Sequence, residues 1–176
     1  MPKNIILIGF MGVGKGRTAR ELSQLTGRLM VDTDNIIESF TKKKIRVIFA
    51  DQGEAAFRAM ERQTANWLQH HVTNTIVATG GGFFMVKNIR KLGRIIYLHS
   101  SVEGIIATIH NHPNAAKKIK KRPLLQNLNA ARELYSRRLP LYRKAADHEI
   151  NVEGKDIRAV AEEIARISHE HFVEIG

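Results

Sequence analysis

The sequence predicts an α/β fold, in which helices cover both faces of a parallel β-sheet. Short apolar runs rich in β-branched residues alternate along the chain with longer segments of helical periodicity. Such alternation is typical of strands that are buried on both faces and joined by helical crossovers. The chain has 176 residues without an internal repeat or a linker, so we expect a single domain spanning residues 1–176.

The individual elements follow from periodicity and from residues that begin or end helices. Strands are expected at residues 4–8, 29–31, 75–79, 94–98 and 148–152. Helices are expected at residues 15–26, 35–40, 45–51, 54–71, 101–110, 130–138 and 156–171. Ser101 and Asp156 are expected to be N-caps, and Gly27 a C-terminal cap. Pro140 is expected to lie beyond the end of the helix at residues 130–138.

Basic residues are concentrated in two segments of a chain whose formal net charge is +11. Residues 117–144 contain ten Lys and Arg against one acid, Glu133, and residues 42–46 contain four more basic residues. A basic surface is typical of proteins that bind nucleic acid, anionic lipid or small phosphorylated ligands, and composition does not separate these. Residues 111–126 are polar, basic and interrupted by proline, so we expect a mobile loop there rather than a core element.

Cysteine and long apolar runs are both missing from the sequence. A chain without Cys has no disulfide framework and no thiolate metal site. The longest apolar run near the start, residues 5–8, is too short for a membrane span or for a signal peptide. We therefore expect a soluble, cytoplasmic protein that does not bind membranes.

The strongest motif lies where the first predicted strand meets the first predicted helix, and it reads Gly-Phe-Met-Gly-Val-Gly-Lys-Gly from Gly9 to Gly16. A glycine-rich loop in this position is typical of phosphate-binding P-loops. Its backbone N–H groups can converge on phosphate oxygens, and the helix N-terminus adds a favourable field. Lys15 would contact the β- and γ-phosphates as a point charge. The alternative is a glycine-rich turn without a ligand, which the lysine in register disfavours.

The position after Lys15 departs from this motif. A Ser or Thr there usually supplies a hydroxyl ligand to Mg²⁺, whereas this chain has Gly16. Thr18 is no substitute, because two residues along a helix turn the side chain by about 200°. We expect Mg²⁺ to be held by phosphates, waters and acids from elsewhere, and to bind more weakly than usual.

Two acids and a glycine cluster follow the second and third predicted strands. The carboxyl ends of parallel strands form the edge where ligands bind. Asp32 could therefore hold a metal-bound water, and Asp34 could orient a substrate hydroxyl or accept its proton. Asp34 could instead cap the helix that follows it. Gly80, Gly81 and Gly82 could bring bare backbone close to a ligand, although a tight turn explains them equally well.

Together these motifs resemble the shikimate kinase family, small P-loop kinases of the nucleoside-monophosphate-kinase type. The resemblance covers residues 3–165, and its further pieces are Gly53-Glu54, Phe57-Arg58, Glu61, Ala78-Thr79, Arg122-Pro123-Leu124-Leu125, Arg138-Leu139-Pro140-Leu141-Tyr142 and Ala145-Ala146-Asp147. It implies a three-layer α-β-α P-loop fold with a central five-stranded parallel sheet in the order 2-3-1-4-5. It also implies a mobile lid at about residues 111–126 and a shikimate-binding segment at about residues 34–62.

The implied reaction is ATP-dependent phosphorylation of the 3-hydroxyl of shikimate, giving shikimate 3-phosphate and ADP in aromatic amino-acid (chorismate) biosynthesis. The implied catalytic residues are Asp34, Lys15 and Arg122, the last of them on the lid. The implied substrate-binding residues are Asp34, Arg58, Gly80, Gly81, Gly82 and Arg138, where the two arginines grip the carboxylate. The implied ATP-binding residues are Gly12, Val13, Gly14, Lys15, Gly16, Arg17 and Arg122. Mg²⁺ would be held by Asp32 through water.

The chain also departs from the family pattern at Arg17 and at Thr108, where members usually carry an arginine that packs on adenine. Two other hypotheses stay open. One is a related P-loop kinase for another small hydroxylated acid or sugar, and the other is a nucleotide- or nucleic-acid-binding protein with little turnover. The basic segment lacks interleaved aromatic residues, so we expect no nucleic-acid partner. His110 and His112 have no third ligand at motif spacing. We expect a monomer whose partners are shikimate and ATP.

Overall fold

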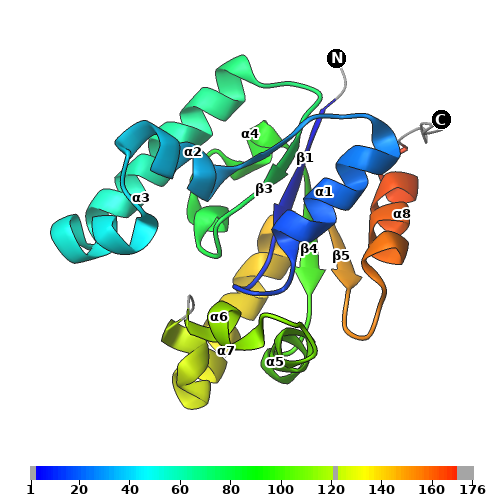
Figure 1. The fold of residues 1–176 in the computed structure, drawn as a ribbon. Coiled ribbons are helices and arrows are strands. Elements are labelled where there is room, and N and C mark those ends of the chain that lie inside the picture. The colour runs from blue at the N-terminus through cyan, green and yellow to red at the C-terminus, as the bar shows by residue number, and fades with distance from the viewer. Residues whose placement is uncertain (1–2, 121–122, 170–176) are drawn as a thin grey trace.

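The computed structural model describes residues 3–120 and 123–169, in which five parallel strands form one sheet between layers of helices (Figure 1). The strands are β1 (Asn4–Ile8), β2 (Met30–Asp32), β3 (Ile76–Ala78), β4 (Gly93–His99) and β5 (His148–Asn151). Their order is β2-β3-β1-β4-β5, and every neighbouring pair is parallel. This order confirms the predicted three-layer α/β fold.

The helices pack on both faces of the sheet. They are α1 (Lys15–Thr26), α2 (Thr33–Thr41), α3 (Ile45–His71), α4 (Ile89–Leu92), α5 (Val102–His110), α6 (Ala115–Lys120), α7 (Leu128–Ala145) and α8 (Ile157–Ile167), with 3₁₀ turns η1 (Phe83–Met85) and η2 (Pro123–Gln126). Alternate β1 residues face opposite layers, since successive side chains of a strand point to opposite faces. Ile5 and Leu7 pack with α1 and α8, whereas Ile6 and Ile8 pack with α3, α5 and α7.

Two sequence predictions about local structure were wrong. The helix expected to end before Pro140 runs to Ala145 in α7. Ser136, whose carbonyl loses its helical partner at Pro140, is exposed to water, and burial of Tyr142 and Ala145 stabilises the continuation. The segment 111–126 was expected to contribute no core element, yet it includes α6 and η2. Leu125 of η2 is only 5% exposed and belongs to the hydrophobic core.

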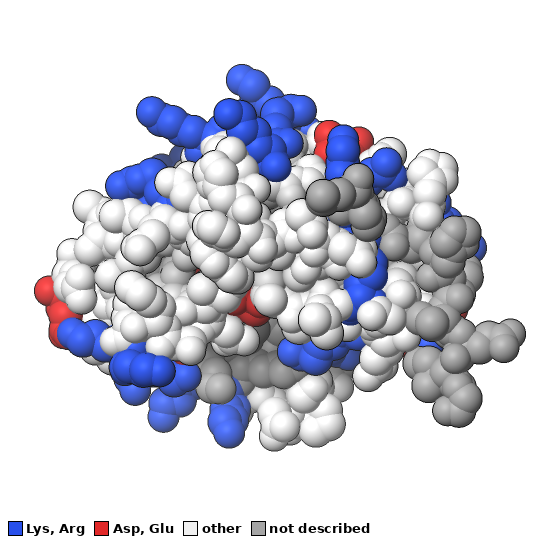
Figure 2. All heavy atoms as spheres, turned by 90° about the horizontal axis from the view of Figure 1, so that it is seen from above, with Lys and Arg blue, Asp and Glu red and all other residues white. Residues whose placement is uncertain are grey.

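Basic side chains are not confined to the segment 117–144. Figure 2 views the molecule from above Figure 1, where the strands begin, and shows Lys and Arg in groups at opposite sides of this face with few Asp or Glu. Some of the basic side chains can therefore be seen from the side where the strands begin. Within the described ranges, no helix is long and apolar enough to cross a membrane.

The start of β1 is held by one buried polar side chain. Asn4 is 4% exposed, and its Nδ2 donates hydrogen bonds to the carbonyls of Val72 and Leu92, both at 2.9 Å. Its Oδ1 accepts a hydrogen bond of 3.0 Å from the backbone N–H of Thr75. One amide thus joins β1 to the end of α3, to the start of β3 and to α4.

Asn4→Ala is expected to lower the free energy of unfolding by about 2–4 kcal/mol, because three buried hydrogen bonds are lost and their backbone partners stay buried. Urea unfolding measures the effect. Asn129→Ala, at an exposed position in α7, should change the stability by less than about 0.5 kcal/mol. Equal effects of the two substitutions would contradict this role of Asn4.

Candidate active site

The P-loop joins β1 to α1 at the carboxyl edge of the sheet. Gly12 and Gly14 have φ angles of 81° and 103°, in the left-handed region that favours glycine. Gly14 is the N-cap of α1 and supplies no side chain, so the first N–H groups of the helix keep their capacity to bind an anion. The structure therefore places Gly12, Val13 and Gly14 in the loop, with Gly16 and an exposed Arg17 in the first turn of α1.

Lys15 is buried at the end of this loop. Its Nζ donates hydrogen bonds to the carbonyls of Gly9 at 2.7 Å and Phe10 at 3.0 Å. Lys15 also lowers the pKa of Asp34, although burial outweighs it there. The ammonium group therefore lies in the P-loop and acts electrostatically on the acid predicted to meet the substrate.

Gly16 leaves a space beside the P-loop. A β-carbon at this position would lie 3.8 Å from Asp32 Oδ2 and 3.9 Å from Arg20 Nη1, which are ordinary contact distances. Thr18 is 3% exposed and is one of the residues that α1 buries. The position of the usual hydroxyl is thus open in this chain, with one carboxylate oxygen facing it.

The structure assigns different tasks to the two predicted acids. Asp32 is the N-cap of α2, and its Oδ1 accepts hydrogen bonds from the backbone N–H groups of Asp34 at 2.9 Å and Asn35 at 3.2 Å. The alternative in which Asp34 caps this helix was therefore wrong. Because Asp32 caps α2, the carboxylate of Asp34 is left to project from its first turn.

Asp34 carries a carboxylate that is poorly compensated within the protein. Its Oδ1 is buried and forms no hydrogen bond with the described residues. Burial raises the pKa of Asp34 from 3.8 to about 6, and repulsion from Asp32 adds to this shift. Perturbed acids of this kind are concentrated at functional sites, because a bound ligand can supply the missing partner.

Residues 80–82, the glycine tripeptide, follow β3 and lie against the functional side chains. The N–H of Gly80 donates a hydrogen bond to Thr33 Oγ1 at 3.1 Å, and a β-carbon on Gly80 would lie 2.7 Å from Asp34 Oδ1. A β-carbon on Gly82 would overlap the guanidinium of Arg58. A side chain at either position would displace the carboxylate of Asp34 or the guanidinium of Arg58, so the tripeptide is more than a tight turn.

Arg58 of α3 is held in place by two acids. Its Nη1 lies 2.6 Å from Glu61 Oε2, and its Nη2 lies 2.9 Å from Glu54 Oε1. Glu61 is 2% exposed, and burial raises its pKa although Arg58 opposes the shift. The guanidinium of Arg58 is thus fixed by two carboxylates and does not extend freely into solvent from the helix surface. Sequence reasoning gave Glu61 no role, although its spacing of three residues from Arg58 was a signal.

Arg138 and Tyr142 of α7 meet the glycine tripeptide from the other side. Both donate hydrogen bonds to the carbonyl of Gly81, from Arg138 Nη1 at 3.2 Å and from the Tyr142 hydroxyl at 2.6 Å. Tyr142 is fully buried and stacks on Tyr97, with ring centroids 5.0 Å apart. Tyr142 was missed as a site residue, although a spacing of four residues places it on the same helix face as Arg138.

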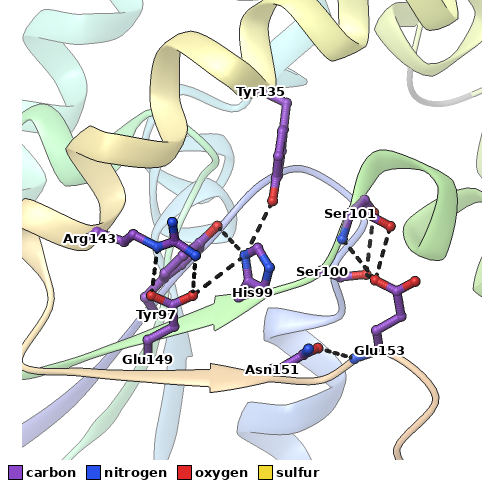
Figure 3. Close-up of polar contacts among 9 residues, drawn as sticks. All are labelled: Tyr97, His99, Ser100, Ser101, Tyr135, Arg143, Glu149, Asn151 and Glu153. Carbon is purple, nitrogen blue, oxygen red and sulfur yellow. Dashed lines mark hydrogen bonds and ion pairs between the residues drawn. The ribbon is translucent and has the colours of Figure 1, made fainter.

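A further polar cluster fixes α7 to the sheet (Figure 3). The hydroxyls of Tyr97 and Tyr135 lie 3.1 Å and 3.2 Å from His99 Nδ1. Glu149 of β5 binds Arg143 of α7 through both of its oxygens, at 2.8 Å and 2.9 Å. These contacts join β4 and β5 to the helix that carries Arg138. No local pattern predicted them, because their members come from separate elements.

The structure describes only part of the predicted lid at residues 111–126. Arg122 lies outside the described residues. Leu125 lies near the P-loop, since a β-carbon on Gly12 would lie 3.5 Å from its Cδ1. Thr108 of α5 donates its hydroxyl to the carbonyl of Gly104, so this position offers no cation. The described carboxyl-terminal end of the segment 111–126 thus lies beside the phosphate loop.

Comparison with protein families supports the resemblance. The family model described as shikimate kinase matches residues 11–168. A shikimate kinase of Helicobacter hepaticus is 40% identical over 164 residues, covering 93% of this chain and 92% of that protein. A shikimate kinase of Caldanaerobacter subterraneus is 36% identical over 174 residues, covering 93% and 95%.

Solved structures show the same fold. The shikimate kinase from Acinetobacter baumannii in complex with shikimate is similar, with a TM-score of 0.81 and 33% identity, covering 94% of this chain and 92% of that one. The shikimate kinase from Aquifex aeolicus has a TM-score of 0.75 and 27% identity, covering 94% and 95%.

Asp34→Asn is expected to raise the free energy of unfolding at pH 8 by about 3 kcal/mol, as an upper value. The folded protein holds this proton up to about pH 6, whereas the unfolded chain loses it near pH 3.8, so ionisation above pH 6 favours unfolding. The gain should shrink as the pH falls and vanish below pH 3.8. Urea unfolding across this pH range measures it.

The control is Asp51→Asn, which removes a carboxylate that is 49% exposed and pairs with Lys43. Its effect should stay within about 1 kcal/mol at every pH. A gain for Asp34→Asn that is the same at pH 8 and pH 4 would contradict a raised pKa.

Proposed function

The chain belongs to the shikimate kinase family, and we propose that it transfers the γ-phosphoryl group of ATP to the 3-hydroxyl of shikimate through the site described above. The observation that carries this proposal is the buried, unpartnered Oδ1 of Asp34. It lies against the glycine tripeptide, which contacts two arginines. Lys15 of the P-loop acts on the same carboxylate. The site thus brings together an acceptor for a hydroxyl, cations for a carboxylate and a loop for phosphate.

Arg58 and Arg138 bind the carboxylate of shikimate. Their guanidinium groups reach the glycine tripeptide from α3 and α7, on either side of it. A planar guanidinium grips a carboxylate through two parallel hydrogen bonds, which sets the orientation of the ring as well as its affinity. Glu61 and Glu54 hold Arg58 in place, and Tyr142 holds the carbonyl that Arg138 contacts.

Asp34 accepts the proton of the 3-hydroxyl. With a pKa of about 6 it is mostly ionised at neutral pH, yet it is more basic than an ordinary aspartate. The 3-oxygen forms a bond to the γ-phosphorus, the bond from that phosphorus to the ADP oxygen breaks, and the proton moves to Asp34 Oδ1. Lys15 and the N–H groups of the P-loop neutralise the charge on the phosphates. Positioning and electrostatics supply the rate enhancement.

Asp32 holds Mg²⁺ through water. Its Oδ2 faces the space beside Gly16, which suits an ion held mainly by waters and phosphate oxygens. When bound, Mg²⁺ neutralises charge on the β- and γ-phosphates. The missing hydroxyl at position 16 is the feature of this chain that weakens the metal site.

Residues 111–126 act as a lid that closes over ATP, and Arg122 contacts the transferred phosphoryl group. Closure excludes water, which limits wasteful hydrolysis of ATP. The closeness of Leu125 to Gly12 supports this proposal, because one end of the lid then adjoins the P-loop. All of these side chains belong to one chain, so a monomer suffices for the reaction. The absence of cysteine suits a protein of the reducing cytoplasm.

Release of ADP from Mg-ATP, followed by a coupled assay with and without shikimate, tests the proposed function. Turnover should require shikimate, and phosphorus NMR should identify the 3-phosphate ester. Asp34→Asn should lower kcat by about 10²–10⁴, whereas Asp51→Asn should leave it unchanged. kcat/KM should fall as Asp34 gains a proton below pH 6. No shikimate-dependent turnover at any Mg²⁺ concentration would overturn the proposal.

Gly16→Ser is expected to lower the Mg²⁺ concentration for half-maximal rate by about ten-fold, as a ligand worth ~1.4 kcal/mol would. The added β-carbon fits, since its nearest neighbours lie 3.8 Å and 3.9 Å away. Gly16→Ala fills the same space without a hydroxyl and should leave the Mg²⁺ dependence unchanged. If both variants behave alike, the effect comes from the helix and not from a metal ligand.

A further inference from the structure

The side chain of Arg20 lies at one side of the open space beside Gly16. Residues four apart lie on the same face of a helix, and helical side chains lean toward the helix N-terminus. Arg20 therefore extends back along α1, and its Nη1 comes within 3.9 Å of the place where a β-carbon on Gly16 would be. Asp32 Oδ2 lies 3.8 Å from the same point. A guanidinium and a carboxylate thus flank the position from which a hydroxyl would bind metal.

The donors of Arg20 are available to a ligand. Arg20 is exposed and makes no hydrogen bond or ion pair with another residue in the ranges 3–120 and 123–169. By contrast, Arg158 of α8 pairs with Glu21, the next residue of α1, and also with Glu162. Arg20 is therefore unpaired among the described residues, whereas the acid next to it on α1, Glu21, is engaged by Arg158.

A guanidinium in this place competes with a divalent cation and suits the same ligand. Two positive charges repel each other strongly in a partly dehydrated site. Phosphate oxygens accept paired hydrogen bonds from the planar fork of an arginine. A serine at position 16 would favour the metal, whereas glycine leaves the space open to the guanidinium.

We propose that Arg20 binds phosphate oxygens of the nucleotide beside Gly16 and takes over part of the charge neutralisation that a hydroxyl-bound Mg²⁺ would give. The affinity of this chain for nucleotide therefore depends little on Mg²⁺. This inference rests on the proposed function for its ligand, a nucleoside di- or triphosphate, and on no property of shikimate.

Calorimetric titration of ADP in the absence of shikimate, with excess Mg²⁺ or with EDTA, tests the proposal. The wild-type Kd in EDTA should stay within about three-fold of the Kd in Mg²⁺. Arg20→Met should weaken binding in EDTA by about ten-fold and binding in Mg²⁺ by less than three-fold, because the metal then neutralises the phosphates. Arg20→Lys, which keeps the charge and loses the fork, should recover part of the affinity in EDTA.

The matched control is Arg166→Met, which removes the same charge from an exposed position in the last turn of α8. That turn lies beside the start of β4, at the opposite edge of the sheet, since Arg94 donates to the carbonyl of Ile167. Equal losses in EDTA for Arg20→Met and Arg166→Met would overturn the proposal, and so would a wild-type affinity that collapses without Mg²⁺. Normal ADP binding without phosphorylation of shikimate would instead refute only the proposed function.

Discussion

Bare backbone in the glycine tripeptide allows three helices to bring their functional side chains to one place. Asp34 of α2 and Arg58 of α3 approach it so closely that a β-carbon at Gly80 or Gly82 would collide with them. Two side chains of α7 share the carbonyl of Gly81 as acceptor. α7 lies far from α2 and α3 in the sequence, and side chains of all three helices reach the residues that follow β3. The spacing of Asp34, Arg58 and Arg138 therefore depends on residues without side chains.

This close packing leaves the site electrostatically unfavourable before a ligand binds. The buried oxygens Asp34 Oδ1 and Glu61 Oε1 form no hydrogen bond with the described residues, and burial raises the pKa of both acids. A protein selected for stability alone would fill or neutralise such positions. A ligand hydroxyl that donates a hydrogen bond to Asp34 Oδ1 would compensate that oxygen. The instability of the site and its capacity to bind substrate thus have one physical origin.

The positive charge of the chain has several uses. Arg58, Arg143 and Arg158 are held by acids that fix helices in place. Lys15 and Arg138 lie at the site itself. Further Lys and Arg lie in groups toward the edges of the face where the strands begin, at the other end of the molecule (Figure 2). The net charge therefore indicates that anions are attracted, but only individual positions show where one is bound.

The sequence by itself determined the alternation of strands and helices, the P-loop and the missing hydroxyl at Gly16, because each depends on residue types at short spacing. The caps Ser101 and Asp156 were predicted correctly for the same reason. Only the tertiary structure decided that Asp32 rather than Asp34 caps α2, since both positions allow a cap. Packing against the sheet likewise carried α7 through Pro140. The pKa of a carboxyl depends on burial by residues distant in the chain, so local spacing could not reveal it.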